Sequence, residues 1–190
     1  MSKKDVIIDK FVWIDCEMTG LDITKDVLLE IATIITDVNL HIIAEGPDIV
    51  IHQPEGALEA MIPVVKDLHA KSGLTDEVRA STVSLAQAEE QTLSFIGQYC
   101  LQNQAVLAGN SVWQDGIFLR KYMPRITDYL NYRIVDVSSL KVLVRQWYPN
   151  SPNVKFKKAE SHRALADIKE SIEELKWYRK YFFLSSPDKG

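Results

Sequence analysis

The sequence has few cysteines and no long hydrophobic run. Only two of its 190 residues are cysteines, and the spacing of Cys16 and Cys100 matches no metal-binding pattern. Cys16 lies within an apolar run, so we expect a buried free thiol and a reducing compartment. Acidic residues interrupt every apolar stretch before it reaches the ~18 residues of a membrane helix, which excludes a membrane-spanning protein. No secretory signal is visible, so we expect a cytoplasmic protein, with a mitochondrial or other organellar location left open.

The composition has no bias that would set the chain apart from an average globular protein. Hydrophobic residues make up 46% and charged residues 25%, with 8 Gly and 7 Pro. These values exclude collagen-like, low-complexity and wholly disordered chains. No internal repeat or interdomain linker is visible, so we predict a single domain over residues 1–190, with an ordered core over about residues 10–183 and flexible ends.

Charge is unevenly distributed along the chain, although the net charge is only −4. Residues 1–119 contain 7 basic and 18 acidic side chains, whereas residues 120–163 contain 10 and 3. Such a basic segment is consistent with a phosphate-binding face or with a solvated surface, and charge alone does not separate the two. The basic side chains considered for such a face are Arg120, Lys121, Arg133, Lys155, Lys157, Lys158 and Arg163.

Hydrophobic patterning at the start of the chain predicts three strands. Residues 11–18 are apolar on both faces in their first half, as in a central strand covered on both sides. The β-branched runs 28–38 and 42–52 are joined by three residues, which predicts an antiparallel meander with the first strand.

The rest of the chain alternates between helical periodicity and short apolar runs. The predicted elements are helices at 57–70 and 84–101, a strand at 105–108, a helix at 115–122, a strand at 133–137, a helix capped by Ser138 or Ser139, a polar loop at 149–160 and a helix from about 163 to 183. The predicted fold class is therefore α/β: a mixed five-stranded sheet, with a three-stranded antiparallel meander and two further strands, flanked by helices.

Asp15 and Glu17 lie two residues apart near the end of the first predicted strand. A strand rises ~3.3 Å per residue with a period of two, so both carboxylates project from one face ~7 Å apart and can converge on one metal ion. Phe11 and Trp13 precede them on that face, so the strand passes from apolar core to acid at its carboxyl end. Taken alone, the D-x-E pattern is also typical of a solvated strand end.

Three further residues at element ends would complete such a site: Asp115, His162 and Asp167. Five helical residues at ~100° each would place His162 and Asp167 about 140° apart, so we expect His162 in the loop and Asp167 in the first turns of the last helix. An imidazole with an ordinary pKa near ~6.5 is suited to act as a general base. The alternative for His162 is an ordinary surface-loop residue.

Four segments together resemble the oligoribonuclease family of DEDD exonucleases, in the ribonuclease-H-like superfamily. The segments are WIDCEMTGLD at 13–22, GNSVWQD at 109–115, NYRIVDVSSLK at 131–141 and SHRALADI at 161–168. The strings EMTGLD and KYMP go beyond what the superfamily requires. The resemblance implies a ribonuclease-H-like fold and a 3′-to-5′ exoribonuclease that degrades very short oligoribonucleotides, down to dinucleotides, to 5′-mononucleotides.

The same resemblance implies the catalytic residues and the cofactor. Asp15, Glu17, Asp115 and Asp167 would hold two Mg²⁺ or Mn²⁺ ions, and His162 would be the general base. The chemistry agrees, because hard divalent ions prefer carboxylate oxygen. Two ions ~3.5–4 Å apart would activate the attacking water and stabilise the leaving 3′ oxygen.

Substrate contacts are implied in the same way. Leu21 would wedge between the bases and His69 would contact the substrate, while Ser111, Arg133 and Ser138 would cap the 5′ phosphate. Structural alternatives exist for these residues, since His69 would otherwise be an ordinary surface or packing residue, Ser138 a helix cap and Arg133 a surface charge.

A homodimer is the last implication, with Tyr132 of one subunit reaching the site of its partner. The alternative for Tyr132 is packing ahead of a strand. Val64 departs from the family pattern, because a Trp is usual at this position. A Trp would stack on a terminal base, a contact worth ~1–3 kcal/mol that a valine does not provide.

Two other functions fit parts of the same pattern. One is a broader 3′-to-5′ exonuclease of the same superfamily, of the proofreading or RNA-trimming type. The other is a catalytically silent nucleic-acid-binding module, which would not need acids and a histidine at all five catalytic positions.

Overall fold

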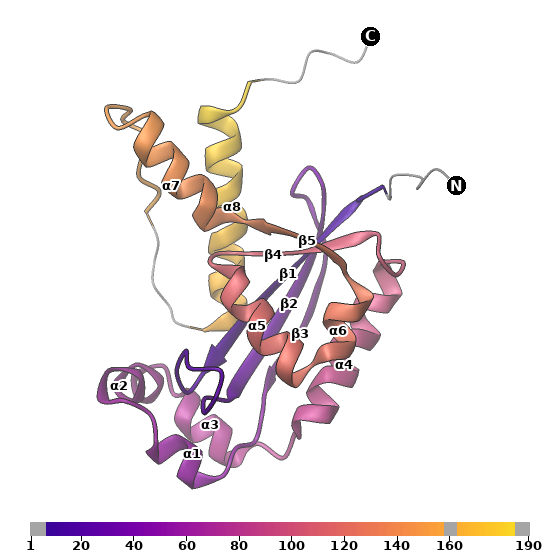
Figure 1. Cartoon of the computed structure of the whole chain (residues 1–190), viewed down its shortest axis with the longest axis vertical. Helices are drawn as coiled ribbons and strands as arrows, with labels where there is room; N and C mark the ends of the chain where they lie inside the picture. The colour runs from indigo at the N-terminus through magenta and orange to yellow at the C-terminus, as the bar shows by residue number, and fades with distance from the viewer. Residues whose placement is uncertain (1–6, 158–162, 185–190) are drawn as a thin grey trace.

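A five-stranded mixed sheet forms the centre of the computed structural model, which describes residues 7–157 and 163–184 (Figure 1). The strand order is β3-β2-β1-β4-β5. The strands are β1 (Lys10–Met18), β2 (Leu28–Asp37), β3 (Ile42–Val50), β4 (Ala105–Gly109) and β5 (Asn131–Asp136). The first three strands pair antiparallel, β4 pairs parallel to β1, and β5 pairs parallel to β4. The predicted α/β fold, with a meander and two further strands, is confirmed.

Helices cover both faces of this sheet (Figure 1). They are α1 (Glu55–Glu59), α2 (Pro63–Lys71), α3 (Leu74–Ala80), α4 (Leu85–Tyr99), α5 (Val112–Tyr122), α6 (Pro124–Tyr129), α7 (Val137–Trp147) and α8 (Ala164–Phe182). Helices α4, α5 and α6 pack on one face, whereas α7 and α8 pack on the other. None of the described helices has the length and apolar character of a membrane span.

Two predictions about the helices were wrong. The predicted helix 57–70 is broken into α1 and α2, because Pro63 begins α2 and the preceding Ile62 adopts an extended conformation. Neither predicted serine caps α7. Its cap is Asp136, whose carboxylate accepts from Ser138 N at 2.9 Å. The short helices α3 and α6 were not predicted at all.

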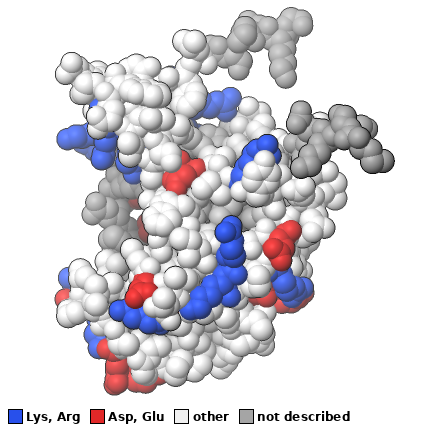
Figure 2. Space-filling model, in the orientation of Figure 1, with Lys and Arg blue, Asp and Glu red and all other residues white. Residues whose placement is uncertain are grey.

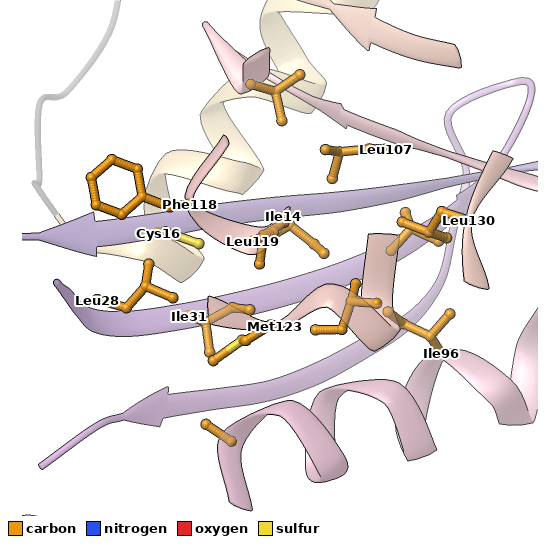
Figure 3. Packing of buried hydrophobic residues seen from close by; sticks show 14 of the residues in the cluster. Ile14, Cys16, Leu28, Ile31, Ile96, Leu107, Phe118, Leu119, Met123 and Leu130 are labelled. Atoms are coloured by element: carbon orange, nitrogen blue, oxygen red, sulfur yellow. The ribbon is translucent and has the colours of Figure 1, made fainter. Parts of the chain in front are cut away.

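Strand β1 runs through the middle of the sheet, and its side chains alternate between two cores. Ile14 and Cys16 pack with α4, α5 and α6 (Figure 3), whereas Trp13 packs with α7 and α8 on the opposite face. Trp13 Nε1 donates to Thr36 Oγ1 over 3.0 Å, which satisfies the buried indole. Because side chains two residues apart share a face, Asp15 and its successor Glu17 continue the Trp13 side at the carboxyl end.

A buried ion pair fixes the start of α8 to the sheet. Glu30 of β2 is fully buried, and its carboxylate accepts hydrogen bonds from Arg163 at 2.7 and 3.0 Å and from Ala164 N at 3.1 Å. Arg163 also donates to Glu77 of α3 at 2.8 and 2.9 Å. One guanidinium therefore joins α8, β2 and α3, and through α8 it sets the position of Asp167.

We expect Arg163→Met to destabilise the protein by about 3 kcal/mol, because it leaves the Glu30 carboxylate buried without its partner. Glu77→Gln is the control, since it breaks only the exposed half of the same network and should cost under about 1 kcal/mol. Urea unfolding followed by circular dichroism measures both. Equal losses in the two variants would contradict the assignment of Glu30–Arg163 as the dominant contact.

Candidate active site

Three of the predicted acidic residues converge at the carboxyl end of β1. Asp15 and Glu17 come from β1, and Asp167 comes from the first turn of α8. Each offers a carboxylate oxygen, and these atoms all lie within 4.8 Å of one another. All three side chains are partly exposed, so a ligand can reach them from solvent.

Asp115 stands next to this cluster but is held differently. Strand β4 pairs with β1 only as far as Trp13, so the later amides on that side of β1 need other acceptors. Asp115, in the first turn of α5, supplies one, because its Oδ1 accepts from Cys16 N at 3.0 Å. Cys16 lies between Asp15 and Glu17 in the strand. Of the residues that the structure describes, the group within 4.8 Å comprises the other three acids and not Asp115.

The carboxylates disfavour one another's charge. Burial raises the pKa of Glu17 to about 8, and the charges of Glu30, Asp167 and Asp115 add to this effect, while Arg163 opposes it. Burial likewise raises the pKa of Asp115 to about 7. A divalent cation bound among these oxygens would reverse the effect, because a positive charge favours the ionised carboxylates. An all-oxygen donor set of this kind fits a hard divalent metal ion.

His69 lies behind the cluster, inside the protein. The side chain is 1% exposed, and its Nε2 donates to the carbonyl oxygen of Met18 at 2.9 Å. Its Nδ1 lies 3.9 Å from Glu17 Oε2. In this position His69 supports the end of β1 and the Glu17 carboxyl, and its predicted contact with substrate stays a prediction.

His162, the predicted general base, lies outside the described residues. The next residue, Arg163, directly precedes α8, and its carbonyl accepts from Asp167 N at 3.0 Å. Arg163, the first described residue after the gap, therefore lies next to the acidic cluster. Asp167 lies in the first turn of the helix, as expected.

The two serines implied in phosphate binding are neighbours in the structure. Ser111 precedes α5 and Ser138 lies in the first turn of α7, and their Oγ atoms are 3.0 Å apart. Ser111 N donates to Ser138 Oγ and to Asp136 Oδ1. Ser111 is in the left-handed region, with φ of 51°, and these bonds hold it there. The alternative of Ser138 as a helix cap does not hold, because Asp136 takes that role.

The remaining candidates for substrate contacts are exposed. Leu21 is 69% and Tyr132 is 81% exposed, which excludes core packing for Tyr132 in the described chain. The Arg133 guanidinium lies 4.6 Å from the centre of the Tyr132 ring, on edge strand β5. Val64, at the start of α2, is also exposed.

The described residues of the basic segment 120–163 do not form one continuous face. Lys121 donates to the carbonyl oxygen of Ile23, and Arg163 is taken up by acidic side chains. Figure 2 shows the basic side chains of one face as separate groups, with uncharged surface and acidic side chains between them. Lys121 and Arg163 therefore serve structural contacts at separate places, and Lys158 lies outside the described residues.

Glu30 was missed by sequence reasoning, although a signal was present. It is the only charged residue in the run LLEIATII of β2. A lone charge in a strand covered on both faces indicates a buried, paired carboxylate. Its partner, Arg163, was considered only as part of a basic surface.

Comparison with known proteins agrees with this geometry. The family model described as "Exonuclease" matches residues 12–175. The oligoribonuclease of Mycobacterium sp. (strain KMS) is 53% identical over 180 residues, which covers 94% of this chain and 84% of the relative. That of Rhodococcus jostii (strain RHA1) is also 53% identical over 180 residues, covering 94% and 90%.

Solved structures share the fold at much lower identity. Exonuclease I from Methylocaldum szegediense superposes with a TM-score of 0.69 at 18% identity, and an Escherichia coli exonuclease I complex with single-stranded DNA with 0.69 at 16%. This chain is covered to 92% in both cases but spans only 41% of those longer proteins. The close relatives, the family model and the shared fold together show that the chain belongs to the oligoribonucleases of the exonuclease family.

Proposed function

We propose that Asp15, Glu17, Asp115 and Asp167 hold two divalent ions, Mg²⁺ or Mn²⁺, in a 3′-to-5′ exoribonuclease of very short RNAs. The chain is a nuclease that hydrolyses phosphodiester bonds, as its family membership establishes. The convergence of three carboxylates within 4.8 Å, in a chain 53% identical to oligoribonucleases, carries the proposal. The products are 5′-mononucleotides, and dinucleotides are the shortest substrates.

The roles of the four acids follow from their positions, and the role of His162 follows from the family resemblance. When bound, two ions would supply a more acidic water and would stabilise the charge that develops on the phosphate and on the leaving 3′ oxygen. Asp15, Glu17 and Asp167 would hold the cations in the partly exposed cluster. Asp115 is held beside this cluster by the hydrogen bond that Cys16 N donates to its Oδ1. His162 accepts the proton of the attacking water.

The exposed apolar surface around β5 supports a homodimer as part of this proposal. β5 is an edge strand, and Tyr132 and Ile134 on it are exposed, as are Trp113 and Ile117 of α5. These residues line a hollow of about 320 Å³. An exposed apolar edge strand favours pairing with another chain. In our proposal a second copy covers this face, and Tyr132 of one subunit reaches the substrate of its partner.

The same chain is proposed to act as one exonuclease domain over residues 1–190 in the cytoplasm, with a mitochondrial location as the alternative. Cys16 and Cys100 are both free and buried, which suits a reducing compartment. Residues 1–6 and 185–190, predicted to be flexible ends, lie outside the described residues.

We expect Asp15→Asn and Asp167→Asn each to lower turnover ~10³-fold or more, because each removes a metal ligand worth several kcal/mol of charge stabilisation. Release of mononucleotide from a labelled dinucleotide, with Mg²⁺ or Mn²⁺ and beside a labelled 20-mer, measures this. Asp128→Asn, the same change on the exposed surface of α6, is the matched control. Activity of purified Asp15→Asn near that of the wild type would refute the two-metal assignment, and preference for the 20-mer would favour a broader exonuclease.

Replacing His162 by Ala should lower activity ~10²-fold or more, because it removes the general base and leaves the acids in place. Mn²⁺ affinity, measured by calorimetry, should stay nearly unchanged. His41→Ala, in the turn between β2 and β3, should keep full activity. Loss of Mn²⁺ binding in His162→Ala would instead make His162 a metal ligand.

The dimer predicts a solution mass near twice 21.6 kDa and a loss of ~1–3 kcal/mol in kcat/KM for dinucleotides in Tyr132→Ala. Tyr181→Ala, another exposed tyrosine, should have no such effect. Mixing Tyr132→Ala with Asp15→Asn should restore activity, because the heterodimer contains one intact acidic site served by one intact tyrosine. Light scattering that finds a monomer with full dinucleotide activity would contradict the shared site.

A further inference from the structure

The loop between β1 and β2, residues 19–27, is closed on itself by one carboxylate. Asp26 Oδ1 accepts from Thr19 Oγ1 at 2.9 Å, and its Oδ2 accepts from Asp22 N at 2.9 Å. Thr19 N also donates to the carbonyl oxygen of Val27 at 3.0 Å. A Cβ atom at Gly20 would lie 2.4 Å from Asp26 Oδ2, so the carboxylate fits only because this residue is glycine. The loop therefore has one tightly determined conformation.

Helix α5 holds the same loop from outside, beside which it lies in Figure 1. Three side chains donate to three loop carbonyl oxygens: Gln114 to Leu21 at 3.3 Å, Lys121 to Ile23 at 2.5 Å and Tyr122 to Asp26 at 2.7 Å. Donors at positions i, i+7 and i+8 share one helix face. We call these three donors the α5 clasp. Lys121 and Tyr122 of the string KYMP thus bind the residues that directly follow EMTGLD, and Gln114 binds Leu21 within it.

The clasped loop is part of the surroundings of the acidic cluster. It begins two residues after Glu17, and the clasp residue Gln114 directly precedes Asp115. Leu21 is 69% exposed on this otherwise well-bonded loop. An apolar side chain held in water by a rigid backbone contributes little to folding, whereas a preorganised apolar contact lowers the entropic cost of binding a ligand. The apolar faces of nucleotide bases are the matching surface.

We propose that Tyr122 and Lys121 are specificity-determining positioning residues, which act through Leu21 on the bases of short substrates. This inference rests on the proposed function. A dinucleotide offers one phosphodiester, so electrostatic attraction contributes little and base contacts must supply much of its affinity. Fixing Leu21 before the substrate arrives therefore raises affinity most for the shortest RNA chains. The α5 clasp in this way increases the preference of the enzyme for dinucleotides.

Tyr122→Phe tests the clasp by removing one hydroxyl and keeping the ring. The matched control is Tyr129→Phe, because the Tyr129 hydroxyl also donates to a backbone carbonyl at 2.7 Å, that of Cys100, and both rings pack against the same core. We expect the dinucleotide KM to rise about 2- to 10-fold in Tyr122→Phe, the range that the net free energy of one hydrogen bond corresponds to. The kcat should change less than about 2-fold, and a five-nucleotide substrate should be affected less. Tyr129→Phe should leave KM unchanged with a similar shift in melting temperature.

A double-mutant cycle shows whether Tyr122 acts through Leu21. If it does, Leu21→Ala should raise KM, and adding Tyr122→Phe to it should raise KM no further. Fully multiplicative effects, or an equal rise in Tyr129→Phe, would overturn the inference. So would an unchanged KM in Tyr122→Phe while the enzyme still hydrolyses dinucleotides. Failure of the wild type to hydrolyse dinucleotides would instead overturn the proposed function.

Gly20→Ala approaches the loop from the other side, by displacing the Asp26 carboxylate. It should reproduce the KM effect of Tyr122→Phe. Gly56→Ala, where an added Cβ meets no atom within 4 Å, is its control and should behave as the wild type. A wild-type KM in a folded Gly20→Ala protein would contradict the role of the loop conformation.

Discussion

Repulsion among carboxylates at the end of β1 is the constraint on which the rest of this structure depends. Asp15, Glu17 and Asp167 are brought within 4.8 Å, and burial together with neighbouring charge raises the pKa of Glu17 to about 8. When all three are ionised, such a cluster would push α8 away from the sheet. The buried Glu30–Arg163 pair holds the first turn of α8 in place against this repulsion. A buried ion pair thus lies next to the acidic residues whose repulsion opposes folding.

Side chains of β1 alternate between its two faces, and this alternation separates the residues that pack in the cores from the acidic residues of the site. Ile14 and Cys16 bind β1 to α4–α6, while Trp13 binds it to α8, so the strand is immobilised from both sides. Only the residues after Trp13 extend past the end of β4, and there acid replaces core on the Trp13 face, whereas Cys16 stays in the core on the other face. Helix α5 serves both sides of this division, because it carries Asp115 and also the donors that hold the loop with Leu21. A rigid frame thereby presents a small number of exposed groups to a short substrate.

Much of the fold could be predicted because its signals are local. The β-branched runs of β2 and β3 and the alternation along β1 depend on burial of neighbouring residues, which periodicity records directly. The errors have equally local causes. Pro63 ends a helical pattern that hydrophobic spacing alone continues, and Asp136 competes successfully with Ser138 for the cap of α7. The short helices α3 and α6 have too few turns for periodicity to show.

By itself, the sequence determined the sheet, the family and the placement of Asp15 and Glu17 on one face, since strand geometry makes residues two apart neighbours. Only the tertiary structure decided which distant groups meet. The contacts of Glu30 with Arg163 span 133 residues and that of Tyr122 with Asp26 spans 96. No local pattern contains such pairings, because they arise when packing of the two cores brings separate segments together and buried polar groups must then find partners.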